Sequence, residues 1–153
     1  MEANKKIIEN LNHLLAIAND GKEGYKNAAE NADAAELKAL FTTYSIQRAE
    51  FEMELKTTIR EHGGDADNEK GGPLGALHRT WIDIKTVFTT NDNHAVIDAV
   101  ITGEKAAVEA YDEVLSDENM GFDLRQMLIA QREDINECLK NVQNLEERYA
   151  HQK

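Results

Sequence analysis

Two short polar units with the same spacing are the residues of this sequence best placed to carry chemistry. Gln47 and Glu50 lie three residues apart, and Gln131 and Asp134 repeat that spacing 84 residues later. Side chains three apart on a helix lie about 60° apart around its axis, so both members of each unit can address one point. Carboxylate and amide oxygens are the ligands that hard cations prefer. The spacing therefore indicates a metal or ligand site inside a helical bundle.

The composition predicts that these units lie in a single all-helical domain. The chain has 153 residues, a length that fits one domain with a substantial core. Its hydrophobic content of 41% is too high for a disordered protein. A single proline, few aromatic residues and many Ala, Glu, Lys and Leu residues favour helices throughout.

Charge and cysteine content restrict the partners and the compartment. The net charge of −12 would repel a phosphate backbone and an anionic bilayer, so we expect neither nucleic acid nor membrane as a partner. The lone Cys138 excludes an intramolecular disulfide and suits a reducing compartment. The first twenty residues hold no uninterrupted apolar run of the kind that a signal peptide has. A cytoplasmic location is the expectation.

Apolar periodicity predicts four long helices and one short helix. The first is expected to continue through Gly21, and the second to turn Leu40, Gln47 and Phe51 inward while Phe41 and Ile46 stay exposed. A Gly-rich loop at 63–73 should end the second helix. The expected long helices span about 4–32, 34–62, 93–115 and 122–149, and the short one spans 74–88.

The second and last long helices align with one another at an offset of 84 residues. The alignment pairs like with like at Leu40–Leu124, Gln47–Gln131, Arg48–Arg132 and Leu55–Leu139. Two helical hairpins joined by one long connection make a ferritin-like topology. We therefore predict one domain over residues 1–153, an all-α, ferritin-like four-helix bundle with a short crossover helix.

Three sequence segments resemble those of a known family. The chain resembles an uncharacterised bacterial family of ferritin-like four-helix-bundle proteins through DGKEGY (20–25), LHRTW (77–81) and GEKAAVEAY (103–111), and the resemblance covers nearly the full length. It implies that Glu23 and Glu104 occupy the single-acid positions of a ferritin-like metal site and that the two Gln-x-x-acid units occupy the paired positions. The candidate metal ligands are Glu23, Glu50, Glu104 and Asp134, with Gln47, Gln131 and Tyr111 beside them.

The sequence departs from the ferritin-like ligand pattern where that pattern is most diagnostic. Gln47 and Gln131 replace the acids of the two acid-x-x-His units, and Glu50 and Asp134 replace the histidines. Three arrangements follow: four carboxylates around a hard cation, a metal-free network in which both glutamines bond to Glu104 and Tyr111, or Glu50 and Asp134 at the solvent margin.

We expect no cofactor and a non-enzymatic bundle with a structural or protein-interaction role, as a homo-oligomer or with another protein. The alternative is an iron- or manganese-binding protein, or an oxidase, that uses the interior carboxylates.

Overall fold

Four long helices make up the computed structural model, which describes residues 2–66 and 93–150. The described residues contain no strand, so the predicted all-α fold is confirmed. The helices are α1 (Glu2–Asn31), α2 (Ala35–Glu61), α4 (Asn93–Leu115) and α5 (Phe122–Ala150). Within these ranges, no helix has the length and apolar character needed to cross a membrane.

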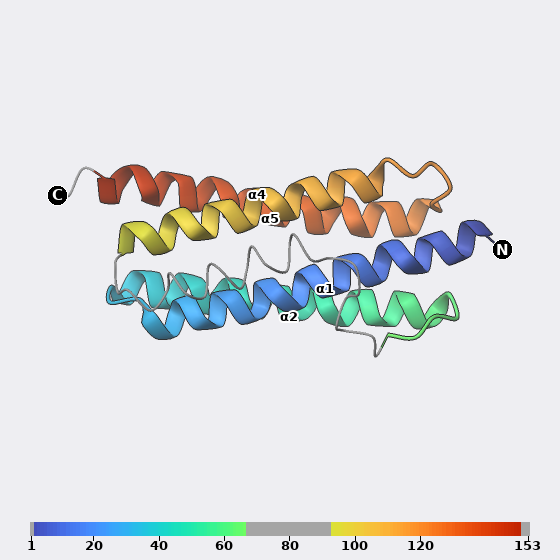
Figure 1. The fold of residues 1–153 in the computed structure, drawn as a ribbon, viewed down its shortest axis with the longest axis horizontal. Coiled ribbons are helices and arrows are strands. Elements are labelled where there is room, and N and C mark those ends of the chain that lie inside the picture. Colours follow the sequence, from blue (N-terminus) through green and yellow to red (C-terminus); the bar gives the residue numbers. More distant parts are fainter. Residues whose placement is uncertain (1, 67–92, 151–153) are drawn as a thin grey trace.

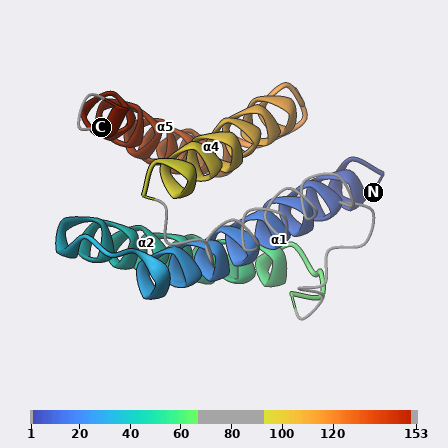
Figure 2. The ribbon, with the colours of Figure 1, turned by 60° about the vertical axis from the view of Figure 1, so that its left-hand side comes forward.

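The helices form two antiparallel hairpins that pack as two layers (Figure 1 and Figure 2). α1 and α5 run in one direction and α2 and α4 run in the other, so α4 begins at the end of the bundle opposite to that where α2 ends (Figure 1). The predicted loop beyond residue 66 and the predicted short helix at 74–88 lie outside the described residues and stay predictions.

The helix ends follow the sequence signals closely. α1 continues through Gly21 without a break, as predicted. α2 ends in a Schellman motif, in which the Gly64 N–H donates to the Ile59 carbonyl at 2.9 Å and the Gly63 N–H donates to the Arg60 carbonyl at 3.0 Å. Gly63 has a φ of 84°, in the left-handed region that glycine adopts without strain. The predicted turn between the last two long helices is also present, between Leu115 and Phe122.

The apolar core is divided into two clusters along the bundle. One contains Leu11 and Leu14 of α1 with Leu55 of α2, and it includes Tyr111 and Leu128. The other contains residues nearer the opposite end: Tyr25, Phe41, Tyr44, Val100 and Val142. In α2 and in α4 the boundary between the clusters falls at a charged residue, which is Arg48 and Glu104 respectively.

The buried face of α2 keeps the predicted Tyr44, Phe51 and Leu55, but at two positions the residue that follows the predicted one is buried instead. Phe41 is buried rather than exposed, and Leu40 and Gln47 are only partly buried. The buried positions alternate in steps of four and three, the spacing of a coiled-coil seam: Leu37, Phe41, Tyr44, Arg48, Phe51 and Leu55. A shift of one residue turns a side chain by about 100°, so Arg48 faces the core in place of Gln47. Ile46 is exposed, as predicted.

Candidate site at the centre of the bundle

A buried ion pair joins the two hairpins at the boundary between the apolar clusters. Nη2 of Arg48 on α2 donates to Oε2 of Glu104 on α4 at 2.5 Å. The side chains are 1% and 0% exposed. Removing either charge from water costs several kcal/mol, a cost that only a close and well-oriented partner offsets. Each residue therefore depends on the other for its place in the core.

Aromatic rings and a glycine shape the space around the guanidinium. Cζ of Arg48 lies 5.3 Å from the centre of the Tyr25 ring and 6.0 Å from that of Phe51, distances suited to cation–π attraction. On α1, a Cβ added at Gly21 would lie 3.1 Å from Nη1 of Arg48, so the glycine leaves room for the guanidinium. Three helices thus enclose Arg48 with groups that fit a planar cation.

The charge state of this cluster follows from its contacts. Burial is the largest influence on the pKa of Arg48 and would lower it, but the charge and hydrogen bond of Glu104, together with Tyr25 and Cys138, raise the pKa above its ordinary value. Burial first, and then the Glu104 charge, raise the pKa of the Tyr25 hydroxyl well above its ordinary value. Arg48 therefore stays a cation and Tyr25 stays neutral at physiological pH.

The contact between Gly21 and Arg48 leads to an expected coupling between two substitutions. Alanine favours a helix over glycine by up to about 1 kcal/mol. In this chain, however, the new Cβ of Gly21→Ala would press on Nη1 of Arg48 and disturb its bond to Glu104. We expect Gly21→Ala to be less favourable in the wild-type chain than in an Arg48→Met chain, by about 1 kcal/mol in a double-mutant cycle followed by urea unfolding. Equal effects in both chains would contradict this contact.

Gln131 is the centre of a second buried polar group, which links three helices. The Tyr111 hydroxyl of α4 donates to Oε1 of Gln131 at 2.6 Å, and Nε2 of Gln131 donates to Oε1 of Glu54 on α2 at 3.1 Å. Gln131 and Tyr111 are each 1% exposed. This bond belongs to the metal-free network, which was one of the three arrangements that the sequence left open. Burial raises the pKa of Tyr111, so its hydroxyl remains a hydrogen-bond donor.

Gln47 does not take the equivalent role, so the alternative in which both glutamines bond to Glu104 and Tyr111 holds for Gln131 and Tyr111 alone. Oε1 of Gln47 instead accepts a bond from Sγ of Cys138 at 3.3 Å. The Cys138 side chain is buried, and burial raises its pKa to about 11. A thiol with this pKa is protonated at neutral pH, so Cys138 behaves as a small core residue rather than as a nucleophile.

The four predicted metal ligands do not come together. Glu104 is fully buried and bonded to Arg48. Glu23 is 44% exposed in its side chain and lies 4.0 Å from the Lys22 ammonium. Glu50 and Asp134 are exposed on the outer faces of α2 and α5. The structure therefore places one carboxylate in the interior and three outside it.

The donor set in the interior does not fit the iron or manganese centre of a ferritin-like protein. Such a centre holds two metal ions, which several carboxylates and imidazoles coordinate. The buried residues of the described chain include Glu104 and Glu52 as carboxylates and no histidine, and each of the two acids is already paired with a basic side chain. The Arg48 guanidinium would also repel a metal cation at this position.

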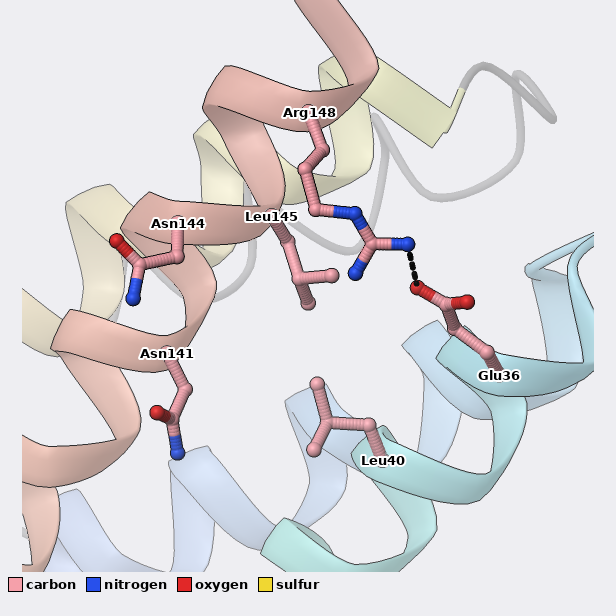
Figure 3. Close-up of a pocket in the computed structure, with 6 residues that line it drawn as sticks. All are labelled: Glu36, Leu40, Asn141, Asn144, Leu145 and Arg148. Carbon is pink, nitrogen blue, oxygen red and sulfur yellow. Dashed lines mark ion pairs between the residues drawn. The ribbon is translucent and has the colours of Figure 1, made fainter.

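A shallow groove lies between α2 and α5 and does not include Arg48 or Glu104 (Figure 3). Leu40 and Leu145 line it from opposite helices, with Asn141 and Asn144 beside them. Nη2 of Arg148 and Oε1 of Glu36 are 3.2 Å apart at its rim. Both charged side chains are about half exposed, and an ion pair of this kind adds little stability. The partly buried Leu40, which was expected in the core, belongs to this groove.

Comparison with known proteins places the chain in a family but provides no characterised relative. Residues 6–117 match the model of a family described as "Domain of unknown function (DUF2383)". No curated protein and no solved structure matches the chain. The match begins in the first turns of α1 and includes all of α2 and α4.

Proposed function

The chain belongs to the DUF2383 family, a domain of unknown function, and we propose that it is a ferritin-like bundle protein without enzymatic activity. In this proposal the buried pair of Arg48 and Glu104 occupies the place of a metal centre and fixes how the two hairpins meet. The role is structural or one of protein interaction, in the bacterial cytoplasm. The observation that carries the proposal is the 2.5 Å ion pair between two side chains with almost no exposure.

The arrangement of the helices supports the ferritin-like part of the proposal. Two antiparallel hairpins pack together, and α2 and α4 run in the same direction (Figure 1). The end of α2 and the start of α4 therefore lie at opposite ends of the bundle, as do the two helices that the crossover joins in ferritin-like folds. Glu104 lies in the interior of α4, where the resemblance places a metal-binding acid.

The protonation states of the interior support the non-enzymatic part. A general base or nucleophile needs a pKa close to the working pH. Burial instead raises the pKa values of Tyr25, Tyr111 and Cys138, so these groups keep their protons. Arg48 and Glu104 neutralise one another. The core groups are therefore suited to holding the helices together rather than to transferring protons.

The outer surface supports a role in protein interaction. Ile46 and Met53 are exposed on α2 and lie seven residues apart, so they share one face of the helix. Phe122 is exposed at the start of α5. These are apolar groups that a second copy of the chain or another protein would cover.

Metal analysis of the full chain tests the proposal. The protein is purified without chelator, its iron and manganese are measured by mass spectrometry, and its oxygen uptake is measured after addition of Fe²⁺. We expect iron and manganese far below one ion per chain and no oxygen uptake above that of Fe²⁺ alone.

The result that would overturn the proposal is stoichiometric iron or manganese that disappears in Glu104→Gln. The matched control is Glu109→Gln, which removes an exposed carboxylate from the same helix. A metal that is retained in Glu104→Gln lies outside the core and leaves the proposal intact.

A further inference from the structure

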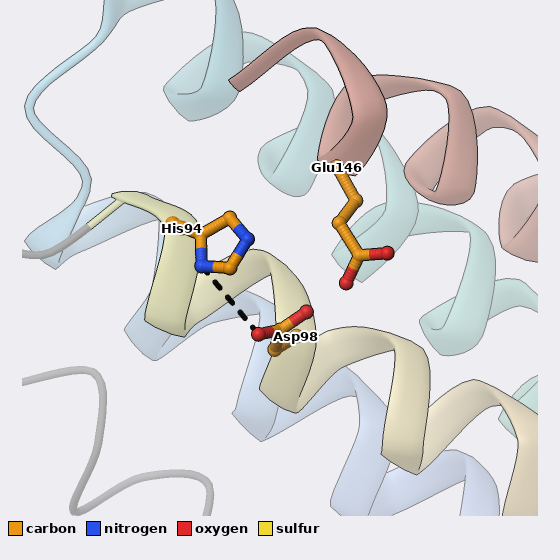
Figure 4. Close-up of side chains that lie close together, drawn as sticks. All are labelled: His94, Asp98 and Glu146. Carbon is orange, nitrogen blue, oxygen red and sulfur yellow. Dashed lines mark ion pairs between the residues drawn. The ribbon is translucent and has the colours of Figure 1, made fainter. Parts of the chain in front are cut away.

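Three potential metal ligands converge where the start of α4 meets the last turns of α5 (Figure 4). His94 and Asp98 lie one helical turn apart on α4, and Nδ1 of His94 is 3.6 Å from Oδ2 of Asp98. Glu146 of α5 points toward them (Figure 4). One ligand atom from each of the three residues lies within 4.8 Å of the other two. Among the described residues, this is the group of His, Cys, Asp and Glu side chains that is close enough to share an ion.

The chemistry of this group is that of a cation site rather than of an ion pair alone. The His94 and Asp98 side chains are 33% and 48% exposed, so their pairing with each other contributes little. Glu146 adds a second carboxylate near Asp98, and two like charges at this spacing repel one another. A divalent cation would neutralise both carboxylates and gain an imidazole nitrogen. The group thus offers a charge and a donor set that complement such an ion.

We propose that His94, Asp98 and Glu146 bind one divalent transition-metal ion, with Zn²⁺ as the ion that their donor atoms fit best. Zn²⁺ accepts nitrogen and oxygen ligands in a tetrahedral arrangement, and water supplies the fourth position when the protein supplies three. Neighbouring ligand atoms in such a site are roughly 3.4 Å apart, given metal–ligand distances of about 2.1 Å. The partly exposed side chains here need to move by about one ångström to reach that spacing. The bound ion would tie the start of α4 to the end of α5.

Zinc titration of the full chain, stripped of metal by a chelator that is then removed, tests this site. We expect isothermal titration calorimetry to show one Zn²⁺ per chain. His94→Ala and Glu146→Gln should each weaken binding by at least about tenfold, because loss of a direct ligand costs at least as much as loss of a group that only orients one. His62→Ala and Glu137→Gln remove a histidine and an exposed acid elsewhere and should bind as the wild type does. Circular dichroism confirms that each variant is folded.

Three outcomes would overturn the site, and only the last of them also overturns the proposed function. Absence of a single saturable zinc site in the wild type, or unchanged binding in both His94→Ala and Glu146→Gln, rejects the site and leaves the proposed function standing. Zinc lost in Glu104→Gln but retained in His94→Ala places the ion in the core and rejects both proposals. Zinc lost in His94→Ala and retained in Glu104→Gln supports both.

Discussion

Arg48→Met is expected to lower the free energy of unfolding by about 3–5 kcal/mol. The substitution leaves the Glu104 carboxylate fully buried without the guanidinium that bonds to it. A charge in the core without a partner is among the most destabilising features that one substitution can create. Urea unfolding followed by circular dichroism at 222 nm measures this loss, because the helices unfold with the core.

Two further variants show whether the loss comes from the unpaired charge. Arg48→Met combined with Glu104→Leu replaces the whole pair by apolar groups and should recover most of the stability, since such replacements are often neutral or favourable. Arg132→Met removes the aligned arginine of α5, which pairs with Asp112 at the surface, and should cost at most about 1 kcal/mol. A double variant no more stable than Arg48→Met would show that the charges do not depend on one another.

Gln131→Leu is expected to lower the free energy of unfolding by about 1–3 kcal/mol. The Tyr111 hydroxyl then remains buried without the acceptor that it has at 2.6 Å. Gln47→Leu should cost less than about 1 kcal/mol, because Gln47 is partly exposed and, among the described residues, accepts its bond from a thiol, a weak donor. Urea unfolding of the two variants side by side measures the difference between two glutamines that the sequence aligns with one another.

The double variant Gln131→Leu with Tyr111→Phe is the control for this comparison. It removes the donor together with its acceptor, so it should be more stable than Gln131→Leu alone. An equal loss in Gln47→Leu and Gln131→Leu would mean that the two glutamines contribute equally to stability, contrary to the different contacts described above.

The sequence was sufficient to predict the helices because each carries its own signals. Apolar periodicity placed the ends at Leu115 and Phe122 correctly, and the glycine pair at 63–64 marked the end of α2. Continuity of α1 through Gly21 also followed from the periodicity on both sides of the glycine. These are local properties that hold whatever the helix packs against.

The central ion pair could not be predicted in the same way, because it depends on how the helices are rotated against one another. The alignment of α2 with α5 matches Gln47 to Gln131. Of these two glutamines only Gln131 is fully buried, and in α2 the neighbouring Arg48 is buried in place of Gln47. Arginine is rarely buried without a charged partner, so Arg48 is assigned to the surface unless its pairing with Glu104 is known. The seven-residue spacing of Phe41, Arg48 and Leu55 was the signal available.

The most direct test of the account is to locate metal ions in the crystallised full chain by anomalous diffraction after soaking with Fe²⁺ or Mn²⁺. We predict an intact pair of Arg48 and Glu104 and no anomalous peak at Glu104, because the guanidinium bonded to this carboxylate would repel a metal cation beside it. A peak coordinated by Glu104 together with Glu23, Glu50 or Asp134, with Arg48 displaced, would contradict the account.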